Sequence, residues 1–246
     1  MIELNLGNFD RVIEILKPLV CTEINESQDC VTYADEMYFR HVRLASALAG
    51  KGNYDINEIL DRMVVENKSL EEALAGDSNL DLSDSDQRTD FAADMAYLQK
   101  AIEVLADVFL VNPRPDSSDL NAEKFLVSGQ FQELVYSAIK ILNCETIFNF
   151  ISADLASQRG VLDEFPMCSF TSITGKIDDV INIFPELFGD CESCSAAAEQ
   201  FSEQQEALNG ILGELGEGSS DEERTSELLV EKCIEQGSSE EACRGS

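Results

Sequence analysis

Apolar side chains recur along this chain at the three- and four-residue spacing of amphipathic helices, and no stretch alternates apolar and polar residues for long. The strongest such pattern begins at a candidate cap, Thr89 or Asp90, and ends before Pro113 and Pro115, which cannot continue a helix. Six apolar residues repeat at these intervals within it: Phe91, Met95, Leu98, Ile102, Leu105 and Phe109. The spacing predicts an all-α protein, built as an array or bundle of about nine helices.

Weaker patterns of the same kind predict helices on both sides of this segment. Cys21 and Cys30 bracket a polar loop between the first two, and residues 161–174 follow no regular pattern. The further helices are expected over 9–20, 31–49, 56–64, 69–74, 118–142, 147–155, 177–184, 191–215 and 228–234.

Two polar, turn-rich segments divide the pattern and suggest where the chain has linkers. The first is acidic, and the second is rich in Gly, Ser and Glu, a composition typical of flexible chain. We therefore expect an N-terminal helical region at 1–76, an acidic loop or linker at 77–88, a main helical bundle at 89–215, and a flexible linker with a terminal helix at 216–246.

The acidic linker resembles a calcium-binding EF-hand loop only in part. Asp77, Asn79 and Asp81 fall at positions one, three and five of such a loop. Leu82 stands at position six, where a sharp turn needs Gly, and Arg88 at position twelve, where calcium needs Glu. The motif fails, so no metal site is predicted, although weak calcium binding by the acidic linker stays open.

Acidic residues dominate the charge of the chain. Its 48 Asp and Glu against 17 Lys and Arg give a formal net charge of −31. Such a surface repels phosphates, so neither nucleic acid nor an anionic membrane is expected as a partner. Two interpretations remain: the charge only keeps the protein soluble, or acid, calcium or a basic partner neutralises it and switches assembly.

No stretch approaches the roughly 18 apolar residues of a membrane span. The first residues show neither the basic region nor the apolar region of a signal peptide. The chain is therefore either cytosolic or a mature segment from which a signal peptide is missing.

The eight cysteines favour the second possibility, because an even number in local pairs suits an oxidised, extracellular protein. We expect disulfides Cys21–Cys30 and Cys233–Cys243, with the other four cysteines paired among themselves. Two sequons, at Asn25 and Asn67, are candidate glycosylation sites and fit secretion weakly. Buried free thiols in a cytosolic protein remain the alternative. The candidate disulfide residues are Cys21, Cys30, Cys144, Cys168, Cys191, Cys194, Cys233 and Cys243.

Cys191 and Cys194 form a CxxC motif at an expected helix start, where a thiol pKa is lowered and redox chemistry is favoured. Redox motifs of this kind usually follow a strand, and a zinc site would need a second close ligand pair. The chain shows neither. A structural disulfide is therefore the preferred interpretation, over a redox or zinc site.

The sequence contains few of the residues and motifs on which catalytic sites are built. The chain has one histidine, His41, on the apolar face of an expected helix, so a core histidine is favoured over a catalytic base or a pH sensor. There is no phosphate-binding loop, dinucleotide fingerprint or basic patch. We predict no enzyme, no catalytic residue, no cofactor and no metal ligand.

These observations predict a secreted, acidic, non-enzymatic protein that acts by protein–protein interaction or assembly, including self-association. Beyond its linker, the tail that carries Cys233 and Cys243 could bridge to another chain instead of folding back. The alternative is an extracellular carrier of a small apolar ligand or lipid, because periodicity does not distinguish a packed helical core from a lined cavity.

Overall fold

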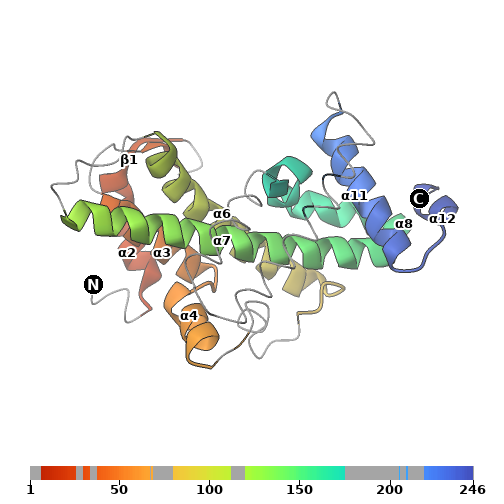
Figure 1. Ribbon diagram of the computed structural model, residues 1–246, viewed down its shortest axis with the longest axis horizontal. Helices are drawn as coiled ribbons and strands as arrows, with labels where there is room; N and C mark the ends of the chain where they lie inside the picture. The colour runs from red at the N-terminus through yellow and green to blue at the C-terminus, as the bar shows by residue number, and fades with distance from the viewer. Residues whose placement is uncertain are drawn as a thin grey trace. The chain divides into compact units, whose positions relative to one another are not determined.

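The structure, a computed structural model, describes residues 7–25, 30–33, 38–66, 68, 80–111, 120–174, 205, 209 and 219–245. Helices make up most of these residues, and three disulfides join them, which confirms the expected disulfide-stapled all-α fold (Figure 1). In chain order the elements are α2 (Phe9–Val20), β1 (Cys21–Ile24), β2 (Cys30–Tyr33), α3 (Tyr38–Lys51), α4 (Ile56–Val64), α6 (Ser85–Val111), α7 (Leu120–Ala153), α8 (Leu155–Gln158), the 3-10 helices η1 (Arg159–Glu164) and η2 (Pro166–Cys168), α11 (Asp221–Glu235) and α12 (Glu240–Arg244).

The chain divides into two compact units. The first consists of Met1–Asp61 and Ala93–Tyr136, and the second of Arg62–Ala92 and Ser137–Ser246. Each unit combines two separate stretches of chain, because α6 and α7 contribute residues to both. The parts expected from the sequence, by contrast, are contiguous.

In the first unit, α2 packs on α3 through a close approach that only small residues permit. The ring of Phe9 lies against the backbone of Gly50, where a Cβ would collide with it. Ala45 and Ala49 on α3 are fully buried, as small residues at a close helix contact should be. His41, on the same helix, is 1% exposed, so it occupies the core position that its apolar neighbours indicate.

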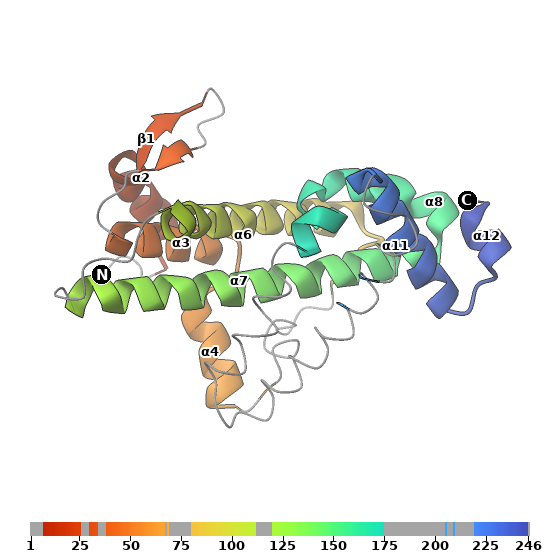
Figure 2. The same ribbon diagram turned by 45° about the horizontal axis from the view of Figure 1, so that its top comes forward.

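A two-stranded antiparallel sheet replaces the loop expected between Cys21 and Cys30, and β1 continues directly from α2 (Figure 2). Its second strand also takes the first residues of the helix expected over 31–49, which begins only at Tyr38. The prediction of a helix from Val31 was wrong because Val31, Thr32 and Tyr33 favour strands, and a disulfide joins the two strands at Cys30.

The helix α6 begins four residues before the expected cap at Thr89. Asp84 provides the cap: its carboxylate accepts hydrogen bonds from the N–H of Asp86 at 2.9 Å and of Gln87 at 3.4 Å. Arg88, which spoils the EF-hand pattern, instead binds the Glu164 carboxylate through Nε at 2.9 and 3.0 Å. The last part of the acidic linker is thus a capped helix start.

The helix α7 is continuous for 34 residues, so the two helices expected over 118–142 and 147–155 are one. The polar residues between them do not interrupt it, and the Thr146 hydroxyl donates to the Leu142 carbonyl of the same helix at 3.1 Å. By length and composition, Gly129–Ala153 could cross a membrane, with a mean hydropathy of 1.2, contrary to the expectation above. This is weak evidence, because 72% of it is buried and a core helix of a soluble protein has the same composition.

The second unit packs α11 on the end of α7. The hydroxyl of Ser152 donates to the Leu229 carbonyl at 3.1 Å, and both residues are buried. Ser220 and Glu223 form a reciprocal capping box at the start of α11. Residues 219–223 therefore form the cap and first turn of a helix, and the expectation of a flexible linker there was wrong. The Ser-x-x-Glu pattern of a capping box explains the difference.

Several expectations lie outside the described residues. They are the helices over 69–74 and 177–184, the helix over 191–215 except residues 205 and 209, which are helical, the sequon at Asn67, and the cysteines Cys191 and Cys194.

Candidate functional site

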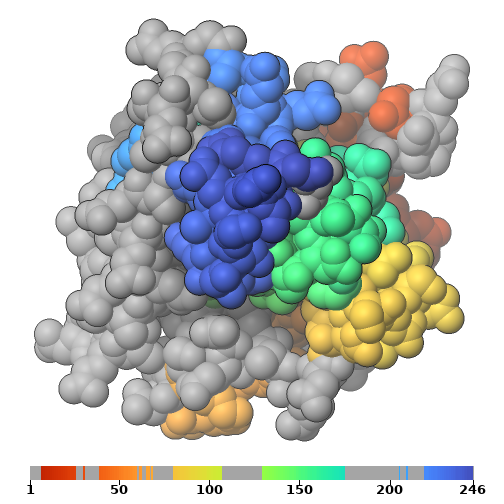
Figure 3. Space-filling view, turned by 90° about the vertical axis from the view of Figure 1, so that its right-hand side faces the viewer, coloured from red at the N-terminus to blue at the C-terminus, as the bar shows by residue number. Residues whose placement is uncertain are grey.

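A pocket of about 600 Å³ lies in the second unit, between the 3-10 helices and the first turns of α11. Figure 3 faces this part of the molecule, with α11 and α12 in blue beside the green segment that follows α7. The pocket is lined by Arg159, Leu162, Asp163, Phe165, Pro166, Ser169, Asp221, Glu222, Thr225, Ser226 and Leu229.

Three buried side chains support the pocket from behind, since Phe165 is 0% exposed, Leu229 1% and Thr225 3%. The apolar surface that solvent reaches comes from Leu162, which is half-buried, and Pro166, which is exposed. Phe165 stands between the two 3-10 helices, where its N–H donates to the Leu162 carbonyl at 2.9 Å and Pro166 opens the next turn. Its ring also packs on Phe91 of α6, with centroids 5.9 Å apart. Aromatic packing and two short turns therefore hold this apolar surface in place.

Charged side chains surround this apolar surface. Asp163 and Glu222 are exposed, Asp221 is half-buried, and Arg159 is the one basic residue of the lining. Burial raises the pKa of Asp221, but hydrogen bonds from Thr171 and Ser169, with the nearby Arg224, outweigh burial and lower the pKa below its ordinary value. The Thr171 N–H donates to Asp221 at 2.6 Å. At neutral pH the rim thus carries more negative than positive charge.

An acidic rim over an apolar surface suits a cation that carries hydrocarbon. Lysine and arginine side chains have this composition, because their charged heads stand on methylene stems that bury well. The hydroxyl of Thr225 is already engaged, since it accepts from the Phe170 N–H at 2.9 Å and donates to the Asp221 carbonyl at 2.7 Å. The geometry therefore supports binding of a basic side chain through the carboxylates.

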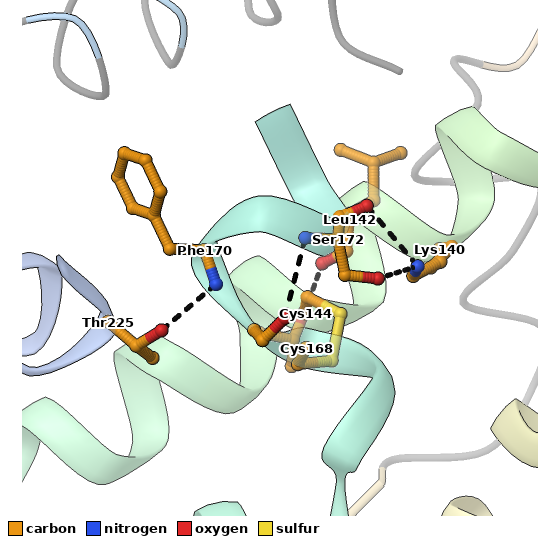
Figure 4. Close-up of a disulfide and its surroundings, with 9 residues drawn as sticks. Lys140, Leu142, Cys144, Cys168, Phe170, Ser172 and Thr225 are labelled. Carbon is orange, nitrogen blue, oxygen red and sulfur yellow. Dashed lines mark hydrogen bonds between the residues drawn. A yellow bond between two sulfur atoms is a disulfide. The ribbon is translucent and has the colours of Figure 1, made fainter. Parts of the chain in front are cut away.

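A second polar arrangement lies beside a disulfide (Figure 4). Lys140 of α7 is 6% exposed, and its Nζ donates to both the hydroxyl and the carbonyl of Ser172, the latter at 3.3 Å. Some hydrolases use a Ser–Lys pair, but neither residue lines the pocket. With the Cys144–Cys168 disulfide, the pair ties the turn at 170–173 to α7.

The structure joins six of the expected cysteines in three pairs, each with a Cα–Cα distance in the usual range. The distances are 5.4 Å for Cys21–Cys30, 5.3 Å for Cys144–Cys168 and 6.0 Å for Cys233–Cys243. These agree with the local pairing expected from the sequence. They are also compatible with an oxidising, extracellular environment.

The C-terminal tail folds back on its own chain, so the idea that its cysteines bridge to another chain was wrong. Cys233 and Cys243 pair with each other and are only 5% and 0% exposed. Arg244 also binds the Glu227 carboxylate of α11 through both terminal nitrogens. A capped short helix, α12, brings Cys243 back to α11, and the polar composition of the tail does not reveal this.

The other predicted residues do not meet at the pocket. His41 lies in the core of the first unit, and Asn25 is exposed just after β1. Within the described ranges, no group of three or more His, Cys, Asp or Glu side chains is arranged to hold a metal ion.

Sequence reasoning missed the pocket because its walls come from residues 159–169 and 221–229, which are distant in the chain. The first range has no regular pattern, and the second begins in a segment with a linker composition. The only signal was the excess of acids, which is spread over the whole chain. Comparison with family models, curated proteins and solved structures found no match for this chain.

Proposed function

We propose that this protein is a secreted, non-enzymatic interaction protein whose second unit binds a basic segment of a protein partner. The observation that carries the proposal is the pocket between η1 and α11, with its accessible apolar lining at Leu162 and Pro166 and its acidic rim. A lysine or arginine side chain matches both parts of this surface, since its stem is apolar and its head is positive.

The net charge of the chain supports the same partner. With a formal charge of −31, the protein attracts basic partners over a distance and speeds their encounter. A uniform negative charge does not select one side chain of the partner. The pocket does so, because its surface is shaped and partly apolar. Affinity for such a partner should fall as salt rises, because exposed charge pairs are screened.

Secretion is the part of the proposal that rests on the cysteines. Three disulfides persist in an oxidising compartment and are rare in the cytosol. Asn25 is exposed in the folded chain, so a glycosylating enzyme could reach this sequon.

The pocket does not favour the alternative, a carrier of an apolar ligand or lipid. Four charged side chains stand among its lining residues, and a purely hydrocarbon ligand would cover them without offering them a partner. A cationic side chain fits this lining better than a hydrocarbon chain does.

The test is the affinity of a fluorescent, lysine- and arginine-rich peptide, measured by anisotropy at low salt. The double variant D163N/E222Q removes two rim charges and keeps the side-chain shapes. We expect its affinity to fall several-fold, because each exposed charge pair contributes about 0.2–1 kcal/mol. The control D90N/E241Q removes two exposed carboxylates outside the pocket lining and should bind like wild type. Equal weakening in both variants would show non-specific attraction and refute the pocket as the site.

A further inference from the structure

The first unit carries an arginine pair that is unusual for so acidic a protein. Phe39 stands at the start of α3 and is 36% exposed. The guanidinium carbons of Arg40 and Arg43 lie 5.7 and 5.9 Å from the centroid of its ring. Both distances fall within the range of a cation–π contact. We name these three residues the Phe39 cluster.

Several other basic residues in the described ranges pair with carboxylates. Arg11 binds Glu14, Arg88 binds Glu164, and Arg244 binds both Glu227 and Glu240. Within the same ranges, Arg40 and Arg43 form no ion pair with a carboxylate; their recorded contact is the Phe39 ring. Acids outnumber bases almost three to one in this chain, so two arginines without carboxylate partners on one helix turn offer positive charge to an outside partner.

The composition of the Phe39 cluster is typical of the centre of a protein interface. Aromatic and arginine side chains are enriched where a few residues supply most of the binding energy. Arginine is also weakly hydrated and binds carboxylates with two parallel hydrogen bonds, so it loses less on leaving water than lysine does.

The pocket of the second unit has the complementary character. Its accessible apolar lining, at Leu162 and Pro166, suits an inserted aromatic ring, and Asp163 and Glu222 are exposed carboxylates on its rim. Each feature therefore supplies what the other lacks: a ring and two positive charges on one side, an apolar recess and an acidic rim on the other. A second copy of the chain brings both features into solution at equal concentration.

We infer that the basic segment bound by the acidic pocket is the Phe39 cluster of a second copy of this chain, a local match of charge between two chains that are each acidic overall. This inference rests on the proposed function, because it names the partner of the same pocket. The contact joins two different surfaces, so it is a head-to-tail contact that closes into a ring or continues as a filament. Salt screens both the arginine–carboxylate pairs at its rim and the repulsion between the two acidic copies, so association should be strongest at intermediate salt.

Sedimentation velocity with complementary charge reversals tests this inference. The variant R40E/R43E keeps an intact pocket, and D163R/E222R keeps an intact Phe39 cluster. We expect the wild type to self-associate with increasing concentration at about 0.15 M salt, where screening limits the repulsion between two acidic copies, and each variant alone to be monomeric. Mixing the two variants should restore association, because one intact surface of each kind is then present. Restored association also shows that both variants are folded.

The control R11E/K68E reverses two exposed bases that already pair with carboxylates, and it should associate like wild type. Two results would overturn the inference: a wild type that stays monomeric, or association that R40E/R43E leaves unchanged. Neither result affects the proposed function by itself. That proposal stands if the basic peptide still binds wild type more tightly than it binds D163N/E222Q. If the peptide binds D163N/E222Q as tightly as wild type, the pocket is not the binding site and the proposed function is refuted.

Discussion

The backbone N–H of Phe170 donates a hydrogen bond to the Thr225 hydroxyl at 2.9 Å, across 55 residues of chain. Phe170 is 1% exposed and Thr225 3%, so water does not replace this bond if it is lost. The bond fixes α11 against the turn that follows the Cys144–Cys168 disulfide. Because Thr225 also lines the pocket, the same bond sets the distance between the two pocket walls.

Replacing Thr225 with valine keeps the side-chain volume and removes the acceptor of this bond. The Phe170 N–H is then buried without a partner, which costs about 1–3 kcal/mol. We expect the free energy of unfolding, measured in urea, to fall by this amount. The same substitution at Thr89 is the control: its hydroxyl bonds to the Ser85 carbonyl on an exposed helix surface, where water replaces it. Equal stability of T225V and T89V would contradict the role of the bond.

The Cys233–Cys243 disulfide should stabilise the C-terminal helices by closing a short loop. The two residues are 10 apart in the chain, and a loop of this length contributes about 3 kcal/mol through the entropy of the unfolded state. We expect C233A/C243A to lower the free energy of unfolding by about this amount.

Electrophoresis without reductant checks the pairing itself. The structure predicts that neither Cys233 nor Cys243 takes part in a covalent dimer, so the band pattern of C233A/C243A should match that of wild type. A disulfide-linked dimer that is present in wild type and absent from this variant would show that the tail bridges chains after all.

The parts of the fold that the sequence predicts are those with a local cause. Met95, Leu98 and Leu105 are fully buried on α6, as their helical spacing indicates. The bridges Cys21–Cys30 and Cys233–Cys243 follow from short separations. The sequence pattern did not predict the two strands, because each has only four residues, which is too few for an alternating pattern of apolar and polar residues to be recognised.

The pocket needed contacts that no local pattern encodes. Its walls meet through the Phe170–Thr225 bond and the packing of Phe165 on Phe91, which join residues far apart in sequence. The Phe39 cluster is visible in the sequence only as Phe-Arg-His-Val-Arg. What sets it apart is that its arginines meet a ring and no described carboxylate, and this depends on the folded surroundings of α3.

The capping box of α11 should make stability depend on pH. The Ser220 N–H donates to the Glu223 carboxylate at 2.7 Å, and this bond, with a second from the Ser220 hydroxyl, lowers the pKa of Glu223. A carboxyl with a lower pKa in the folded state stabilises the fold above its unfolded pKa of about 4.3. That stabilisation is lost as pH falls through the lower folded value.

We therefore expect the free energy of unfolding of E223Q to vary less than that of wild type between neutral pH and acid, because glutamine does not titrate. The comparison is made by urea unfolding at several pH values. The control E241Q removes an exposed carboxylate that belongs to no capping box, and it should keep the wild-type pH dependence. Parallel curves for E223Q and wild type would contradict the assignment.

Gly52 should tolerate no side chain, because it lies directly against the backbone of α6. A Cβ at this position would stand 2.5 Å from the Asp94 carbonyl oxygen, and a backbone atom has no alternative rotamer to adopt. Asn53 beside it donates to the Asp94 carboxylate at 2.7 Å, so the turn is held at this distance. We expect Gly52→Ala to lower the free energy of unfolding by about 1–3 kcal/mol, as overpacking does. At Gly160 the same Cβ meets open space, so Gly160→Ala should leave stability unchanged or raise it slightly. If the two variants unfold at the same urea concentration, α3 and α6 do not approach each other as closely as described.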